Sequence, residues 1–140
     1  MTPEQIALVQ QSFTKVVPIS QQAANMFYGQ LFEIAPEVKP MFRGDITEQG
    51  SKLMTTLAVV VNGLTDLNSI LPAASALAKR HVAYGVKPSH YALVGATLLW
   101  TLEKGLGAAW TPGLAAAWRA AYATLSGYMI EEAYGWKSVA

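Results

Sequence analysis

Apolar residues recur at helical spacing along almost the whole chain, and capping residues stand where each run begins. Near the N-terminus, Thr2 can cap a helix, Pro3 fits its first turn, and Gln5 can complete a capping box. The apolar positions that follow keep helical spacing until Pro18 ends the run. The same signals predict five more helices, from about Ser20 to Ala35, Thr47 to Asn62, Asn68 or Ser69 to Tyr84, Pro88 to Leu106 and Pro112 to Ala133.

Prolines and glycines divide these helices from one another. A short element at 36–42 separates the second helix from the third, and Gly63 marks the end of the third. Pro72 is expected in the first turn of the fourth helix, where proline is tolerated. The β-branched run at 59–61 lies inside a longer helical period, and no alternating strand pattern of useful length is present. We therefore expect an all-α protein, with residues 1–140 forming one domain.

Composition and charge narrow the class of protein further. Hydrophobic residues make up 52% of the sequence, which excludes disorder, and the formal net charge is only +1. This charge balance gives no electrostatic case for binding nucleic acid or an anionic membrane. The most apolar run, Leu57–Val61, is far shorter than the ~20 residues that span a bilayer, and no signal-peptide pattern opens the chain. We therefore expect a cytoplasmic protein.

Few residues can carry metal or acid–base chemistry. Cysteine is absent, and the two histidines, His81 and His90, are too far apart in sequence to form a helical metal clamp. His81, near a helix end, is either a half-buried structural histidine or an axial ligand to haem iron. His90 follows a proline at a helix start, which favours a surface or capping role. From residue type alone, Tyr28 and Gln49 remain ordinary helix residues and Phe42 an ordinary core residue.

Six fragments in a fixed order point to a known family. They are FYGQLF at 27–32, APEVKPMF at 35–42, QGSKLM at 49–54, KRHVAYGV at 79–86, HYALVG at 90–95 and AWRAAY at 117–122. Each fragment alone is weak, but their order and spacing together are specific. Over residues 3–134 the chain resembles a globin, and in particular the single-domain bacterial globins akin to the globin domain of flavohaemoglobins.

The resemblance implies a three-over-three helical sandwich around haem b, bound without covalent attachment because the chain has no C-x-x-C-H motif. It implies that His81 is the proximal iron ligand and that Phe42 stacks on the porphyrin. Tyr28 and Gln49 match the distal polar pair, which we expect to share a hydrogen bond, and Leu53 matches the apolar wall beside the ligand. Further haem-contacting positions are Leu57, Leu77, Tyr84, Val86, Tyr91 and Val94.

Some charged residues keep two interpretations. Lys52 and Arg80 either pair with haem propionates or are ordinary exposed charges. In flavohaemoglobins a tyrosine and a glutamate support the proximal histidine, and Tyr91 matches that tyrosine. An ungapped count places the glutamate at Ala133, so Glu132, one residue earlier, is only a candidate for this role. If Glu132 does not reach His81, the donation of electron density to the iron is weaker.

Three functions fit these expectations. The first is a haem protein that reversibly binds O2, NO and CO at an open iron position. The second is an NO dioxygenase that converts NO to nitrate; the printed chain has no room for flavin and NAD domains, so a separate reductase would be required. The third is a haem-free helical interaction module, which a polar Tyr28–Gln49 pair among apolar residues argues against. Whether the protein is a monomer or a homodimer is left open.

Overall fold

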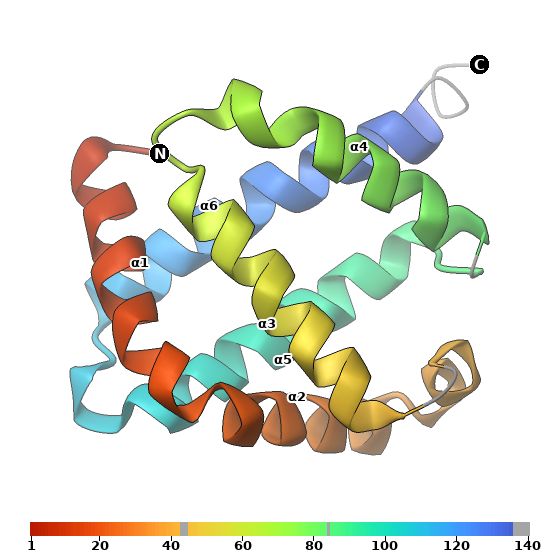
Figure 1. Ribbon diagram of the computed structural model, residues 1–140, viewed down its shortest axis with the longest axis horizontal. Helices are drawn as coiled ribbons and strands as arrows, with labels where there is room; N and C mark the ends of the chain where they lie inside the picture. The colour runs from red at the N-terminus through yellow and green to blue at the C-terminus, as the bar shows by residue number, and fades with distance from the viewer. Residues whose placement is uncertain (43–44, 84, 136–140) are drawn as a thin grey trace.

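The computed structural model describes residues 1–42, 45–83 and 85–135, and these residues form helices without any strand (Figure 1). The six α-helices are α1 Pro3–Val16, α2 Ser20–Ile34, α3 Ile46–Asn62, α4 Leu67–Ala83, α5 Pro88–Leu106 and α6 Pro112–Ile130. The short helical segments between or after them are η1 Val17–Ile19, η2 Pro36–Met41, η3 Gly107–Ala109 and η4 Glu131–Gly135, the last of these π-helical. The expected all-α class is confirmed.

The predicted capping box at the start of α1 is present. The Gln5 amide N–H donates to the Thr2 hydroxyl and the Thr2 amide N–H donates to the Gln5 side chain, both at 3.1 Å. At the start of α3 the expected cap was wrong: Asp45 accepts a 2.8 Å hydrogen bond from the Thr47 amide N–H, and the helix begins one residue before Thr47. An aspartate caps at least as well as a threonine, so the earlier residue takes the position.

The start of α4 also lies earlier than predicted. The helix begins at Leu67, rather than at Asn68 or Ser69, so Pro72 lies inside it instead of in its first turn. The Asp66 carbonyl accepts hydrogen bonds from both the amide N–H and the hydroxyl of Ser69, at 3.0 and 2.7 Å. Ser69 thus closes the first turn from within the helix instead of preceding it.

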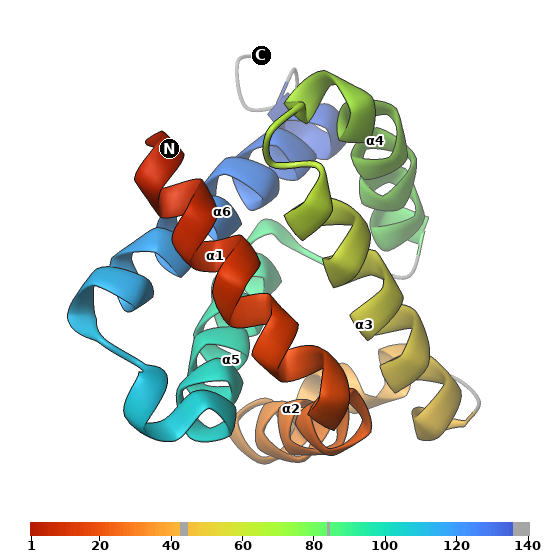
Figure 2. The ribbon, with the colours of Figure 1, turned by 60° about the vertical axis from the view of Figure 1, so that its left-hand side comes forward.

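The helices form two layers that cross one another. α1, α3 and α4 form one layer, and α2, α5 and α6 form the other; Figures 1 and 2 show α3 on the opposite side of the molecule from α5. α2 packs against both α3 and α5, and α6 packs against α1, α4 and α5. This is the three-over-three sandwich that the sequence resemblance implies.

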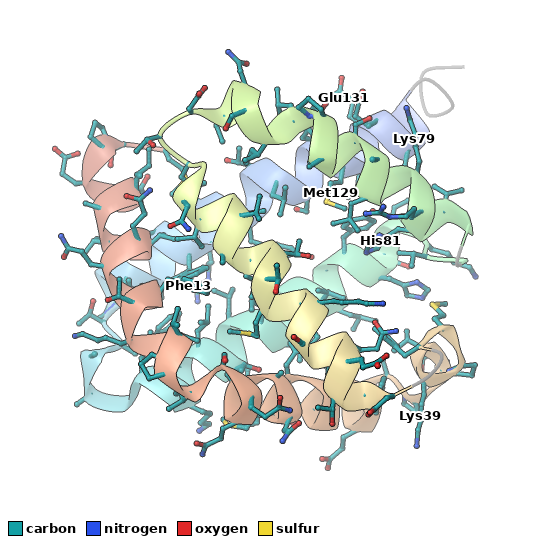
Figure 3. All side chains as sticks on the ribbon, viewed as in Figure 1. Phe13, Lys39, Lys79, His81, Met129 and Glu131 are labelled. Atoms are coloured by element: carbon teal, nitrogen blue, oxygen red, sulfur yellow. The ribbon has the colours of Figure 1, made fainter. Side chains whose placement is uncertain are left out.

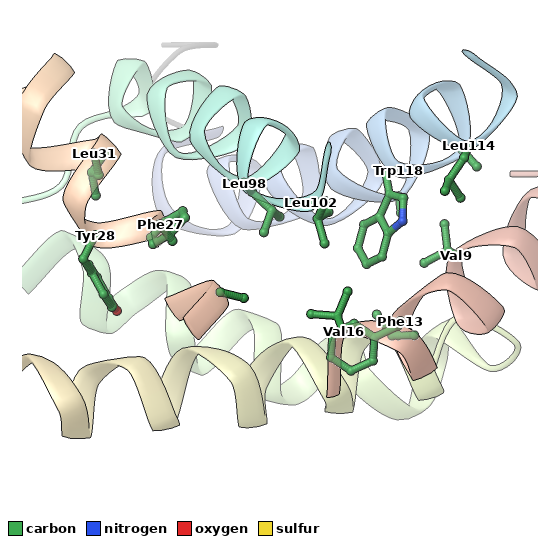
Figure 4. Packing of buried hydrophobic residues seen from close by; sticks show 14 of the residues in the cluster. Val9, Phe13, Val16, Phe27, Tyr28, Leu31, Leu98, Leu102, Leu114 and Trp118 are labelled. Carbon is green, nitrogen blue, oxygen red and sulfur yellow. The ribbon is translucent and has the colours of Figure 1, made fainter. Parts of the chain in front are cut away.

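Trp118 joins the two layers at one end of the core. Its indole packs from α6 against Phe13 of α1, with 6.3 Å between the ring centroids (Figure 4). The indole N–H donates to the Ser12 hydroxyl at 2.9 Å, and that hydroxyl donates to the Val9 carbonyl at 2.9 Å. The buried polar atoms therefore satisfy one another, as buried groups must if they are not to cost stability.

A glycine brings α3 unusually close to α2. A Cβ atom added at Gly50 would lie 2.8 Å from the Ala24 Cβ, which is shorter than real side-chain contacts allow. Ala24 is buried on α2, one helical turn before Tyr28. The close approach at Gly50 therefore sets the distance between the helix that carries Tyr28 and the helix that carries Gln49.

We expect Gly50→Ala to destabilise the fold by about 1–3 kcal/mol, because overpacking forces the two helices apart. Gly29→Ala is the matched control: Gly29 is exposed on α2, and an added Cβ there meets nothing within 4 Å. That substitution should stabilise the protein by about 0.5–1 kcal/mol through helix propensity. Urea unfolding followed by circular dichroism measures both, and a Gly50→Ala protein as stable as the parent would contradict the close approach.

Candidate functional site

The hydrophobic core is divided into two clusters of buried residues. The larger cluster joins α1, α2, α5 and α6, and the smaller one consists of Ala74, Ala78, Tyr91 and Met129. Both clusters are bordered by apolar side chains that are only partly buried: Phe42, Leu53, Leu57 and Val94 beside the larger one, and Leu77 and Val86 beside the smaller one. All six are predicted site residues. An apolar group bound against them would remove more of their surface from water.

His81 lies near the C-terminal end of α4, beside the smaller cluster. Its Nδ1 atom is 2.7 Å from the Leu77 carbonyl oxygen. Because a carbonyl can only accept, Nδ1 carries the hydrogen and the Nε2 atom carries the lone pair. In Figure 3, His81 lies on the side of α4 turned toward the middle of the molecule, whereas Lys79 lies on the opposite side. The helix thus presents an imidazole whose tautomer suits metal ligation through Nε2.

The surroundings of His81 also favour its neutral form. Burial lowers the pKa of His81 and is the largest influence on it. The hydrogen bond to Leu77 acts in the opposite direction, and the nearby positive charge of Arg80 lowers this pKa further. The imidazole is therefore neutral at pH 7, which is the form that binds metals.

Tyr91 of α5 supports the His81 ring. The two rings are stacked, with centroids 6.1 Å apart and an interplanar angle of 28°. The Tyr91 main chain is held in turn by α6, because its carbonyl accepts a 2.6 Å hydrogen bond from the Tyr122 hydroxyl. The structure therefore brings the predicted pair His81 and Tyr91 together and restricts the orientation of the imidazole.

A cluster of aromatic rings surrounds Tyr28 on α2. The Tyr28 ring is 5.3 Å from that of Phe42, 5.9 Å from that of Phe32 and 5.1 Å from that of Phe27. Phe32 also contacts Phe42, at 5.4 Å between centroids. Sequence reasoning missed Phe32 as a site residue, although it stands one helical turn after Tyr28 and thus on the same face of α2.

The Tyr28 hydroxyl reaches across to the start of α3. Tyr28 is buried, and its hydroxyl donates to the main-chain carbonyl of Gln49 at 3.2 Å. Figure 4 shows the Tyr28 ring pointing from α2 toward α3. The two predicted distal residues therefore meet, but the hydrogen bond involves the Gln49 main chain. The side-chain pairing that the resemblance implies did not anticipate this, since every residue offers a backbone carbonyl.

Burial of Tyr28 gives a prediction for alkaline pH. Burial raises the pKa of Tyr28 to about 12, above the value near 10 of an unfolded tyrosine. The contribution of Tyr28 to stability is therefore complete below about pH 10 and is lost as the pH rises through about 12. We expect Tyr28→Phe to show a shallower loss of stability over this range than the parent in urea titrations. Burial also raises the pKa of Tyr122, but Tyr122 is present in both proteins, so its contribution to the pH dependence cancels. Equal slopes would contradict the buried hydroxyl.

The remaining predicted residues occupy several environments. Lys52 and Arg80 are exposed, and Tyr84 lies outside the described residues. His90 caps α5, as expected: the Lys87 amide N–H donates to its Nδ1 atom at 3.0 Å. Within the described part of the chain, no group of three or more metal-ligating side chains is present. Among the same residues, every helix is too short or too polar to span a bilayer.

Glu132 and Ala133 differ in their surroundings. Glu132 is exposed, and its carboxylate accepts a 3.2 Å hydrogen bond from the Tyr128 hydroxyl in the last turn of α6. Ala133 is partly buried and packs against the smaller cluster, which contains Tyr91. A methyl group therefore occupies the position that the ungapped count assigns to the glutamate of the proximal network.

If the chain holds the haem that the sequence resemblance implies, Glu132→Gln should leave the haem absorption spectrum and the iron midpoint potential unchanged, because an exposed carboxylate is strongly screened by water. Potentiometric titration of the parent and the variant, each reconstituted with haem, provides the measurement. A clear shift in midpoint potential would show that Glu132 acts on the proximal histidine after all.

Comparison with known protein families and curated proteins gives consistent matches. The profile of the family described as Globin matches residues 25–129. A flavohemoprotein of Bordetella parapertussis is 30% identical over 133 residues, which cover 93% of this chain and 33% of that protein. A flavohemoprotein of Rhodopirellula baltica is 28% identical over the same shares. The chain thus spans about a third of the length of these curated relatives.

Solved structures show the same architecture. A bacterial globin from Campylobacter jejuni superposes with a TM-score of 0.87 at 27% identity, covering 98% of this chain and 99% of that one. An engineered carbene transferase made from a putative nitric oxide dioxygenase of Rhodothermus marinus superposes with a TM-score of 0.88 at 24% identity, covering 99% and 97%. The second likeness concerns the fold alone.

Proposed function

Because the chain belongs to the globin family, we propose that it holds haem b without a covalent bond and reversibly binds O2 and other diatomic ligands, such as NO and CO. The observation that carries this proposal is the state of His81. Its Nδ1–H is engaged by the Leu77 carbonyl, and burial keeps the ring neutral, so Nε2 is the ligating atom. When haem is bound, its iron supplies the coordination position at which a diatomic ligand binds.

The residues around His81 suit a flat apolar group. The partly buried side chains on the border of the two core clusters would bury more apolar surface against a porphyrin, which stabilises binding by about 25 cal/mol per Å². Phe42 offers an aromatic ring for stacking, since it is only partly buried beside Tyr28. The exposed Lys52 and Arg80 can place cations at the edge of the site, where propionate groups would meet water.

Tyr28 is the proposed hydrogen-bond donor to the bound ligand. Burial keeps its hydroxyl protonated, and its bond to the Gln49 carbonyl is longer than is usual for an O–H donor. Rotation of the hydroxyl hydrogen toward a ligand that carries negative charge would exchange this neutral bond for a stronger one. Surrounding aromatic rings exclude water, and the low local dielectric strengthens the interaction.

Gln49 is proposed to keep the distal side both polar and open. It is half-buried in the first turn of α3, and a glutamine side chain is not an effective ligand for haem iron. Leu53, one turn later on the same face, adds an apolar surface that limits access of water. The pair therefore stabilises a small polar ligand without supplying a protein ligand that would close the position.

Titration of the haem-free protein with haemin tests the proposal. We expect saturation at about one haemin per chain, with an absorption band distinct from that of haemin in buffer. Absence of saturable binding by a protein that is helical by circular dichroism would contradict the proposal and favour the helical interaction module. Steady-state consumption of NO, measured with and without an added reductase, distinguishes ligand binding from NO dioxygenation.

A further inference from the structure

The two C-terminal helices are unusually poor in charge on every side. α5 carries no Asp, Glu, Lys or Arg from Pro88 to Leu102, and Arg119 is the one such residue of α6. A helix that is apolar all round is normally covered on all sides. Yet the faces of these helices that point away from the core include the exposed residues Ala92, Ala96 and Ala123.

These exposed faces meet in a groove. A hollow of about 450 Å³ runs between α5 and α6 and is lined by Ala92, Ala96 and Leu99 from the first helix and by Ala123, Ser126 and Ile130 from the second. Figures 1 and 2 place both helices on the side of the molecule away from α3. Small side chains along a helix pair allow another helix to approach closely, as in four-helix bundles.

The charges at the rim of the groove identify the occupant. Arg119 lines the groove together with Leu99, and Glu103, one turn after Leu99, is exposed on the same face of α5. Neither residue has an ion-pair partner among the described residues. A surface that carries both an acid and a base beside one apolar patch is complementary to itself under a twofold axis.

We propose that this groove binds a second copy of the chain. A twofold axis parallel to the two helices places α5 of each copy along α6 of the other, so that the four helices form an antiparallel bundle. Glu103 of each copy then faces Arg119 of the other, and this pair occurs twice. Lys104 lies about 100° further around α5 and therefore points away from the contact.

Charge reversal tests the proposal on the full, haem-loaded chain by sedimentation velocity and light scattering. The parent is expected at about twice its 15.0 kDa chain mass at micromolar concentration. Arg119→Glu and Glu103→Arg each place like charges together, and each should weaken the dimer at least about ten-fold. The double variant Glu103→Arg/Arg119→Glu reverses both charges and should restore the dimer. Lys15→Glu, on exposed α1 surface, is the matched control and should change nothing.

Further outcomes decide the matter. Ala96→Arg should produce monomers by placing a charge in the middle of the apolar lining, with an unchanged haem spectrum to confirm folding. A parent protein that stays monomeric up to millimolar concentration would overturn the proposal, and the groove would then serve another partner. A dimer that survives Ala96→Arg and both charge reversals, or one that the double variant does not restore, would also overturn it.

Discussion

Replacing His81 with alanine is expected to abolish stable attachment of haem through the iron. His81 is the histidine whose Nδ1–H is held by a main-chain carbonyl and whose ring stacks on Tyr91. Loss of a group that merely supports a metal ligand typically costs 10–100-fold in affinity, so loss of the ligand itself should cost more than about 100-fold. Haemin titration and the absorption spectrum measure the effect. Added imidazole, which can occupy the vacated place, should restore part of the parent spectrum.

His90→Ala is the matched control for this substitution. His90 accepts the Lys87 amide N–H at the start of α5, so its removal deletes a helix cap. We expect a loss of about 0.5–2 kcal/mol in stability and an unchanged haem spectrum. If His90→Ala destroyed the spectrum and His81→Ala preserved it, the assignment of the proximal ligand would be reversed.

Replacing Tyr28 with phenylalanine is expected to speed O2 dissociation about ten- to hundred-fold. This range corresponds to the loss of a hydrogen bond to a charged acceptor, about 1.5–3 kcal/mol. The substitution retains the aromatic ring and its contacts with Phe42 and Phe32, so packing should change little. Dissociation of CO should change less, because CO carries less negative charge and gains less from a donor.

A double-mutant cycle with Gln49→Leu separates the two distal residues. The Tyr28 hydroxyl bonds the main-chain carbonyl of residue 49, which Gln49→Leu retains. Coupling between the substitutions would therefore report on the ligand that both side chains approach. Gln49→Leu should also speed O2 dissociation, and stopped-flow off-rates for O2 and CO in both single variants and the double variant provide the measurement. Unchanged O2 off-rates in all three would show that neither residue donates to the ligand.

The helices could be predicted from the sequence because their ends carry strong local signals. The Thr2 capping box, the prolines and Gly63 placed most boundaries close to where the structure has them. The predictions that failed concerned helix starts at which neighbouring residues could each serve as the cap. Asp45 and Thr47 both suit a helix cap, and the prediction overlooked the earlier residue, Asp45, which caps at least as well; likewise Ser69 closes its helical turn from inside.

The site was predictable in its residue types and much less so in its atoms. The resemblance paired Tyr28 with Gln49 on the distal side and His81 with Tyr91 on the proximal side, and the structure shows both pairs in contact. It did not reveal that a backbone carbonyl accepts the Tyr28 hydrogen bond, because side-chain identity carries no information about backbone acceptors. The exposure of Glu132 was also hidden, since a π-helical segment alters the residue spacing near the end of α6.

The absorption spectrum of the reduced, haem-loaded protein tests the central claim most directly. The account predicts a five-coordinate ferrous spectrum without O2, a distinct spectrum when O2 is added, and return of the first spectrum when O2 is removed under argon. It also predicts that His81→Ala does not reproduce this cycle. A reduced protein whose spectrum is already six-coordinate without added ligand, or does not respond to O2, would contradict an open ligand-binding position beside Tyr28 and Gln49.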